Sequence, residues 1–318
     1  MTAFKKIRQV CEVILTRFGL LVVPRLPRHV VLGLSIFIGR AAYFLSDHLR
    51  SVGWTNLNIA FGTSISDERK RAILHQSFHT IALVFLDVFW FTRKTDERIE
   101  NTISFNPVLE GLAGKKPRIC VTAHLGNWEI LGNAATLRGF PLVSVASPLA
   151  NQRVDDLFME IRESTGQQVL PKHGVVKALL TTLRDGGNIG ILLDQNTKPA
   201  DGGIFVDFFN LPVPVSAAGA SLALRTNAEI VFGFCLPQPD GTYQVHIPFR
   251  MTPQVRDGED MKAAIQRLTQ EIAKVIESAI REYPEAWLWM YKRWKYVGPG
   301  RPRTEYPFYA KELTPRPP

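Results

Sequence analysis

Cysteine is scarce in this sequence. The 318 residues include three cysteines, Cys11, Cys120 and Cys235, which are odd in number and have no short spacing between them. A small disulfide scaffold is therefore excluded, and the spacing does not suggest a zinc knuckle. We expect a protein of a reducing compartment.

An uninterrupted apolar run of transmembrane length, about 20 residues, is also missing. Charged residues and two prolines divide residues 4–47 into shorter apolar pieces. Glu12 and Arg17 interrupt the stretch that a signal peptide would need, and no small-residue cleavage site follows. We interpret residues 4–47 as helices that lie in or dip into a membrane interface, with Lys and Arg reaching the phosphates. An ordinary buried helical hairpin is the alternative.

Acidic residues are rare at the two ends of the chain. The formal net charge is +9. Residues 1–60 carry eight basic and two acidic side chains, and residues 286–318 carry seven basic and two acidic side chains. The basic residues alternate with apolar runs at 18–23 and 30–39. This pattern favours an anionic membrane surface over nucleic acid as a partner.

What the chain does have is enough apolar material for a core, with 46% hydrophobic and 21% charged residues. Apolar runs predict strands, and the segments between them predict helices. The strands are expected at 118–123, 142–146, 188–193, 229–235 and 243–247, and the helices at 67–92, 127–137, 153–164, 175–184, 216–225 and 260–282. This alternation predicts the α/β class, with a mixed central sheet flanked by helices. The expected limits are an N-terminal membrane-associated helical region at 1–60, the α/β domain at 61–298 and a Pro-rich tail at 299–318.

A histidine follows the first of the five expected strands. His124 comes directly after residues 118–123, Gly126 permits a tight turn, and Glu129 falls in the first turn of the next helix. Ligands of open α/β sheets gather beyond the carboxyl ends of strands. A neutral imidazole there can take the proton of an attacking hydroxyl, and a carboxylate on its other nitrogen fixes the tautomer. The alternative is a His and a Glu that only pair at a helix start.

Other chemical motifs are missing or incomplete. The sequence has no P-loop, no G-x-G-x-x-G and no G-x-S-x-G elbow. His75 and His79 have the spacing of metal ligands on one helix face but lack a third ligand. Cys120 is expected to pack inside its strand, with a nucleophilic thiol as the alternative. We expect neither a metal nor a cofactor.

The segment around His124 resembles a known family. His124 and Glu129 match the H-x4-(D/E) motif of glycerolipid acyltransferases, and T-A-H-x-G-N-W-E is similar to the bacterial lipid A biosynthesis (late) acyltransferases. Further similarities follow in the family's order: N-L-x-x-x-F at 56–61, D-Q-x…G-x-F-V-x-F-F-G at 194–210, and P-E-x-W-L-W…R-R-x-K at 284–295. The chain departs from the family pattern at Ser147, where many members have Arg, and at Asn210, where many have a turn Gly.

The resemblance implies a function. It implies a membrane-bound O-acyltransferase that moves a fatty acyl chain from an acyl-carrier protein or coenzyme A thioester to a hydroxyl of a lipid A precursor or related glycolipid. The expected location is the cytoplasmic face of the inner membrane. His124 would be the general base, oriented by Glu129, and Arg162 would stabilise the oxyanion together with backbone N–H groups near Gly126. An ordinary solvated helix residue is the alternative for Arg162.

Substrate contacts are expected from Gly126, Asn127, Lys172, Asp194 and Gln195. A turn that caps the next segment is the alternative for the last two. Other acceptors remain open, namely a lysophospholipid, a phosphatidylinositol mannoside or an aminolipid, as does a non-catalytic lipid-binding membrane protein. The choice of donor and the acyl chain length also remain open.

An aromatic cluster stands near the C-terminus. Trp287, Trp289, Trp294 and Tyr296 are interleaved with basic residues. Such a cluster is typical of a belt at a bilayer interface, and a buried aromatic cluster is the alternative.

Overall fold

The chain begins with helices. The computed structural model describes residues 3–105, 116–172 and 174–313, starting with α1 (Ala3–Val22), α2 (Arg28–Leu45), α3 (Asp47–Phe61) and α4 (Asp67–Trp90). A 3-10 turn, η1 (Val23–Arg25), separates α1 from α2 at Pro24. The side chains of Ser46 and Ser66 accept hydrogen bonds from N–H groups in the first turns of α3 and α4, so both helices start at capping residues. The helix expected at 67–92 is confirmed by α4.

The central sheet is mixed, as the alternation predicts. Its order is β11-β8-β2-β5-β3-β4, in which every neighbouring pair is parallel except β11 with β8. The strands are β2 (Arg118–Thr122), β3 (Leu142–Ala146), β4 (Gln168–Pro171), β5 (Asn188–Leu192), β8 (Glu229–Phe232) and β11 (Arg250–Met251). The strands β2 and β5 lie in the middle of the sheet, so helices can cover both of their faces.

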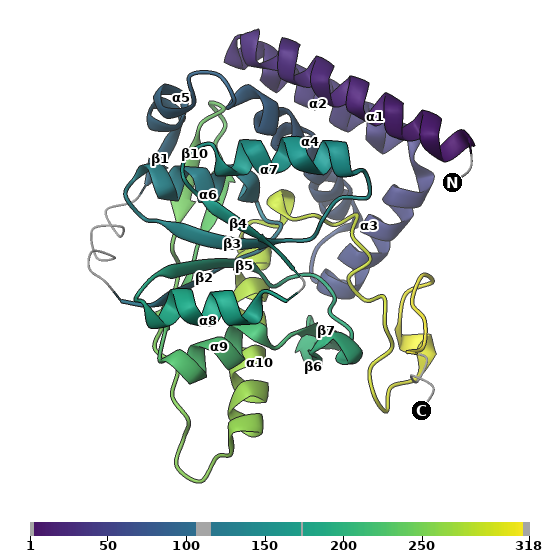
Figure 1. The fold of residues 1–318 in the computed structure, drawn as a ribbon. Coiled ribbons are helices and arrows are strands. Elements are labelled where there is room, and N and C mark those ends of the chain that lie inside the picture. Colours follow the sequence, from purple (N-terminus) through teal and green to yellow (C-terminus); the bar gives the residue numbers. More distant parts are fainter. Residues whose placement is uncertain (1–2, 106–115, 173, 314–318) are drawn as a thin grey trace.

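Helices cover the two faces of this sheet (Figure 1). On one face lie α6 (Trp128–Leu137) and α7 (Gln152–Glu163), with α4 beside α6. On the other lie α8 (Val176–Arg184), α9 (Ala218–Thr226) and α10 (Met261–Glu282). The expected α/β class with a flanked sheet is confirmed.

Two smaller sheets were not expected. One has the order β1-β10-β9. Its strands are β1 (Ile103–Phe105), β10 (Tyr243–His246) and β9 (Phe234–Pro237), and β1 directly follows α5 (Thr95–Thr102). The single strand expected at 229–235 is therefore divided at Gly233, where the chain leaves the central sheet and enters the small one. The other is the hairpin β6 (Gly203–Phe208) and β7 (Leu211–Ser216). Its two-residue turn has left-handed backbone at Phe209 (φ 50°) and Asn210 (φ 60°), a conformation that Asn tolerates.

The C-terminal aromatic residues are buried. Trp287 is 1% exposed and Trp289 and Trp294 are 0% exposed, so the interpretation as a membrane belt is wrong and the buried cluster is confirmed. The cluster follows η4 (Pro284–Ala286). Its rings contact Phe208 and, from α3, Phe61. The tail beyond it contains η5 (Arg303–Glu305) and is anchored by Tyr306, whose hydroxyl donates to the Pro212 carbonyl at 2.9 Å. Residues 314–318 of the expected tail lie outside the described residues.

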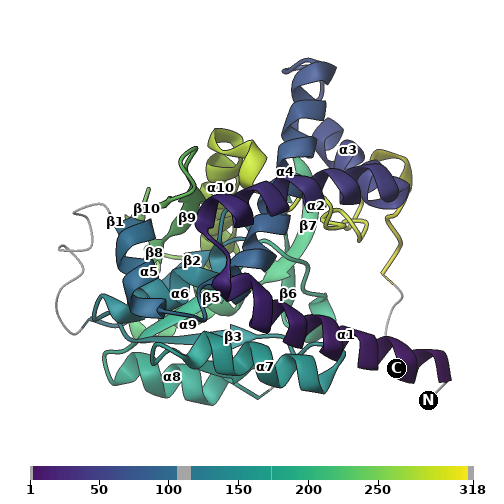
Figure 2. The same ribbon diagram turned by 90° about the horizontal axis from the view of Figure 1, so that it is seen from above.

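The N-terminal helices pack against the rest of the protein on one side and are exposed on the other. Leu57 of α3 belongs to the same core as the strand residue Val121, and α2 packs along α4. Figure 2 shows α1 and α2 diverging from η1, with α1 running out along the body. Large apolar side chains on the open sides are exposed: Ile7, Val10, Ile14, Leu15, Phe18, Leu21, Phe37, Phe44 and Leu45.

Two helices have the length and composition to cross a membrane. In α4, 50% of the apolar window is buried inside the protein, whereas in α2 the buried share is 17%. The helix α4 is thus a core helix, and α2 keeps an apolar side away from the protein.

The crossing of α2 and α4 depends on a glycine, which generates a prediction. A Cβ at Gly39 would lie 2.7 Å from the Cα of His79, whereas a Cβ at Gly33 on the same helix meets no described atom within 4 Å. We expect Gly39→Ala to lower the free energy of unfolding by about 1–3 kcal/mol because backbone must move. Gly33→Ala should raise it by about 0.5–1 kcal/mol through helix propensity. Denaturant midpoints of the two variants measure the contrast, and equal midpoints would contradict it.

Candidate functional site

The site forms where two neighbouring strands end. β2 and β5 are parallel, with Thr122 opposite Leu192, so His124 and Asp194 leave the sheet side by side. The Nδ1 of His124 donates to Oδ1 of Asp194 at 2.8 Å, and the backbone N–H of His124 donates to Oδ2 at 3.0 Å. One carboxylate therefore fixes both the position and the orientation of the histidine.

Asp194 is 2% exposed and keeps its charge through donated hydrogen bonds. Besides the two from His124, Oδ2 accepts one from the indole N–H of Trp287 at 2.9 Å. The same C-terminal segment holds the histidine from the other side, because the N–H of Leu288 donates to the His124 carbonyl at 3.1 Å. Burial works to raise the pKa of Asp194, but the adjacent His124 outweighs it, and the pKa lies below its usual value.

The other imidazole nitrogen, Nε2, faces Gln195. Because the ionised Asp194 accepts from Nδ1, that nitrogen carries the proton and Nε2 has a free lone pair. The side-chain amide of Gln195 donates to Nε2 at 3.1 Å, and 17% of the histidine side chain is exposed. Burial works to lower the pKa of His124, yet the Asp194 carboxylate raises it more, so its pKa lies above the usual value of a histidine. This arrangement can accept a proton from a hydroxyl group that takes the place of the Gln195 amide.

Glu129 does not make the expected contact with the imidazole. Its carboxylate instead binds Arg162 in a bidentate pair, with Nε and Nη2 both 2.8 Å from its oxygens. The reason is geometric: Glu129 is the second residue of α6, and its side chain points to Arg162 of α7. Its link to His124 runs through Trp128, whose indole N–H donates to Glu129 at 3.2 Å and whose ring lies 4.8 Å from the imidazole.

The expected oxyanion donors are already engaged. The N–H of Gly126 donates to the Ala286 carbonyl at 2.9 Å, and the N–H of Asn127 donates to the Cys235 carbonyl at 2.7 Å. Two of the Arg162 nitrogens are bound to Glu129. Gly126 is required at its position, because its φ is +68° and a Cβ there would lie 2.1 Å from the Cys235 carbonyl oxygen.

Asn127 has a different place from the expected substrate contact. Its side chain is 1% exposed and points into the protein. The side-chain oxygen accepts from the Ile130 N–H at 3.2 Å and so caps α6, while the amide nitrogen donates to Asp87 at 3.1 Å. Asn127 therefore stabilises the loop between His124 and α6 from the side that faces the protein interior.

Lys172 lies away from the histidine. It is exposed at the carboxyl end of β4, and β4 is three strands from β2, or about 14 Å at ordinary strand spacing. The structure thus brings together His124, Asp194 and Gln195, places the Glu129–Arg162 pair one turn further on, and leaves Lys172 at the sheet edge.

Two other candidate groups, His79 and Cys120, have structural surroundings. His79 binds the Ser35 hydroxyl at 2.8 Å, and burial raises the pKa of Cys120 to about 12, so its thiol is not a nucleophile. In the part of the chain that the structure describes, no group of three His, Cys, Asp or Glu side chains is placed to hold a metal ion.

Sequence reasoning missed the role of Arg293. This residue is 0% exposed, donates to the Asn196 side chain at 3.2 Å and lies 4.7 Å from the Phe208 ring. Among the described residues it has no ion pair with a carboxylate. Burial lowers its pKa to about 10. Its position in the R-R-x-K segment is the signal that marks it, and it supports the strand end that carries Asp194.

A histidine held by a buried carboxylate at the carboxyl edge of a mixed sheet defines an α/β protein with its candidate site at the usual ligand-binding edge of such sheets. Comparison with known proteins identifies the family. Residues 1–296 match the model of the bacterial lipid A biosynthesis acyltransferases, and the chain belongs to this family.

Curated relatives carry two different names. A phosphatidylinositol mannoside acyltransferase of Mycolicibacterium smegmatis is 25% identical over 198 residues, or 61% of this chain and 62% of the relative. A protein of that name from Mycobacterium tuberculosis is 24% identical, over 58% of this chain and 56% of the relative. A lipid A biosynthesis acyltransferase of Haemophilus influenzae is 23% identical, over 81% of this chain and 78% of the relative. The chain thus matches less than two thirds of the length of the mycobacterial relatives.

The His124–Asp194 contact generates a prediction that needs no substrate. We expect Asp194→Asn to lower the pKa of His124, because the carboxylate that raises it is gone while burial, which lowers it, remains. NMR titration of labelled histidines, with the His124 signal assigned by its loss in His124→Gln, measures the shift. Glu129→Gln serves as the control and should lower the pKa less, since Glu129 acts only through space. An unchanged pKa in Asp194→Asn would contradict the pairing.

Proposed function

We propose that the protein is a membrane-associated O-acyltransferase that transfers a fatty acyl chain from an acyl thioester to a hydroxyl of a lipid A precursor or related glycolipid. The observation that carries the proposal is the imidazole of His124, with Nδ1 held by Asp194 and Nε2 turned toward the Gln195 amide. Membership of the lipid A biosynthesis acyltransferase family supports the reaction class.

The proposed reaction is a single displacement at the thioester carbonyl. The acceptor hydroxyl gives its proton to Nε2 of His124 as its oxygen bonds to the carbonyl carbon. Asp194 stabilises the imidazolium that forms. The tetrahedral intermediate then expels the thiolate, which takes the proton from Nε2, so that an ester and a free thiol are the products. The base ends the cycle neutral, as it began.

The oxyanion of the intermediate needs a donor that is free in the complex. The N–H groups of Gly126 and Asn127 are bound to carbonyls. The amide of Gln195 is half-buried at the imidazole and is released when the acceptor hydroxyl takes its place on Nε2. We therefore assign Gln195 as the oxyanion donor in place of those backbone groups.

Arg162 and Glu129 act as a unit in this proposal. Their bidentate pair closes the side of the site formed by α6 and α7, next to a small hollow lined by Val88, Phe91 and Ile130. The pair also fixes Trp128, which packs against the imidazole.

The membrane supplies the acceptor. The exposed apolar side chains of α1 and α2 stand among basic residues, a combination that suits an anionic lipid surface. We place the protein at the cytoplasmic face of the inner membrane, where acyl-carrier protein and coenzyme A thioesters are both candidate donors.

A second acceptor class is favoured by the relatives. The mycobacterial proteins are named for phosphatidylinositol mannoside, and they align with this chain at 24–25% identity. The Haemophilus relative, named for lipid A, aligns over a larger part of the chain. A mannosylated phosphoinositide is therefore the alternative acceptor.

Loss of the base gives the direct test of activity. We expect His124→Ala to reduce acyl transfer by about 10²- to 10⁴-fold, because a general base contributes that much. Mass spectrometry of total lipids from cells with the wild type or the variant measures the result, as the loss of one acyl chain from lipid A or from another lipid. His48→Ala, at an exposed histidine of α3, is the control. Identical lipids in all strains would contradict the proposal, and the lipid that changes names the acceptor.

The ion pair makes a separate prediction. We expect Glu129→Ala and Arg162→Ala to reduce kcat by similar factors, and the double variant to lose no more than either one, because the two side chains act as a unit. Steady-state rates of the purified variants complete this double-mutant cycle. If Arg162 contacts the oxyanion independently of Glu129, the two losses multiply instead.

A further inference from the structure

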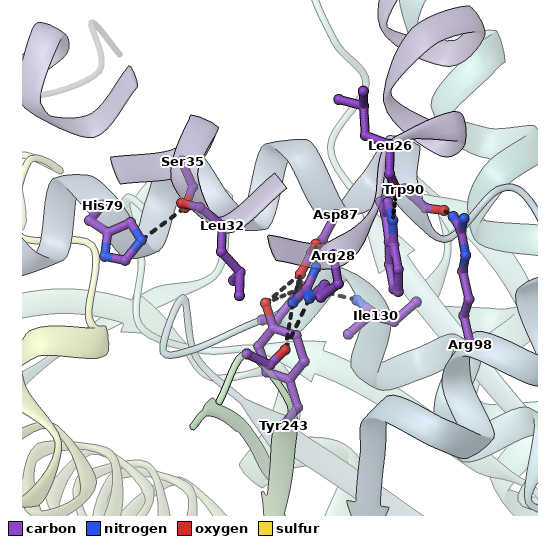
Figure 3. A network of polar contacts seen from close by, with 12 residues as sticks. Leu26, Arg28, Leu32, Ser35, His79, Asp87, Trp90, Arg98, Ile130 and Tyr243 are labelled. Carbon is purple, nitrogen blue, oxygen red and sulfur yellow. Dashed lines mark hydrogen bonds and ion pairs between the residues drawn. The ribbon is translucent and has the colours of Figure 1, made fainter. Parts of the chain in front are cut away.

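A second buried carboxylate lies behind the site. Asp87 of α4 is 1% exposed and accepts hydrogen bonds from three other elements (Figure 3). Arg28 of α2 binds both of its oxygens, Tyr243 of β10 donates its hydroxyl, and Asn127 donates its side-chain amide at 3.1 Å. This cluster of four side chains is called the Asp87 network below.

Arg28 is the cation of the Asp87 network. It stands at the first position of α2, directly after Pro27, and its side chain is 18% exposed. Besides Asp87 it donates to the Gly241 carbonyl through Nε at 3.0 Å and Nη2 at 2.9 Å, and its guanidinium lies 4.8 Å from the Trp90 ring centroid. Every one of these contacts joins the start of α2 to the body of the protein.

The charge of Asp87 depends on this arginine. The side chain of Asp87 is 0% exposed, and burial raises its pKa. Arg28 opposes that effect through its charge and its hydrogen bonds. Without the arginine, the carboxylate is a buried and unpaired charge, and such a charge is expelled or neutralised.

Asn127 carries the effect from Asp87 to the histidine loop. Its amide nitrogen is bound by Asp87 and by the Tyr243 hydroxyl at 3.2 Å, which orients its oxygen toward the N–H of Ile130. Its own N–H is bound to the Cys235 carbonyl. Asn127 is three residues from His124, and the left-handed Gly126 lies between them, so the orientation of Asn127 fixes the return of the loop into α6.

We propose that Arg28 is a positioning residue, which acts through Asp87 and Asn127 to hold the His124 loop at the start of α6. The inference rests on the proposed acyl transfer. It assigns α2 a place in the active enzyme that is separate from membrane attachment. The exposed apolar face of α2 can meet lipid while its first turn, on the opposite side, supports the loop.

The matched variants are Arg28→Met and Arg184→Met, in the full-length protein. Arg184 is an exposed arginine in the last turn of α8, on the other face of the central sheet. In detergent micelles with acyl thioester and extracted lipid acceptor, we expect Arg28→Met to lower kcat by about 10- to 100-fold, as for a displaced catalytic group. KM for the thioester should change less than threefold. Arg184→Met should keep wild-type kcat, and both variants should still float with anionic phosphatidylglycerol vesicles.

Hydrogen exchange adds a readout that does not need activity. In Arg28→Met, peptides that cover residues 122–130 should exchange at least tenfold faster, while peptides from α10 (Met261–Glu282) exchange as in the wild type. If the wild type transfers no acyl chain to any lipid, the proposed function fails, and the exchange comparison alone decides the positioning role. Wild-type kcat with unchanged exchange at 122–130 overturns it.

A second variant covers the case in which Arg28→Met does not fold. Asn127→Ser keeps a capping side chain at the start of α6 but loses the contact with Asp87. We expect a lower kcat with wild-type unfolding temperature, and Arg28→Lys, which keeps the charge, should recover part of the rate. Full activity of Asn127→Ser, or exchange that rises equally in α10, overturns the proposal.

Discussion

The register between β2 and β5 is the constraint on which the site depends. Because Thr122 stands opposite Leu192, the next two residues of each strand carry His124 and Asp194 to one point of the sheet edge. A slip of one residue would turn one of these side chains to the opposite face. The parallel arrangement also leaves both strands covered by helices, so the carboxylate is shielded from water and its contact with the imidazole is strengthened.

The two buried carboxylates are supported in different ways. Asp87 is bound directly by a guanidinium, which suits a permanent structural charge. Asp194 accepts from the indole of Trp287 and from a backbone N–H, and the buried Arg293 acts on it only through space, because its hydrogen bond goes to Asn196. A guanidinium in contact with Asp194 would compete with the imidazolium for it. Without such a contact, the carboxylate is available to His124 in the proposed proton transfer.

The local sequence pattern was sufficient to predict most helices and strands. It was insufficient to predict which strands lie side by side. The strand at 142–146 was predicted to the residue, because Pro and Gly bound it. Asp194 was placed at the sheet edge, but its contact with His124 depends on strand order, which no short spacing encodes. Glu129 was assigned to the imidazole because helix and loop spacing alone do not tell which face a first-turn residue takes. The hairpin strand β7 was missed because Pro212 and Pro214 are rare in strands.

The position of the C-terminal segment affects the order in which the protein folds during synthesis. Trp287 and Leu288 complete the hydrogen bonds around Asp194 and His124, and Tyr309 binds Asn56 of α3. These residues leave the ribosome after the whole sheet and after α1 and α2. A nascent chain can therefore form β2 and β5 before His124 and Asp194 have all of their partners. The order of synthesis separates formation of the sheet from completion of the site.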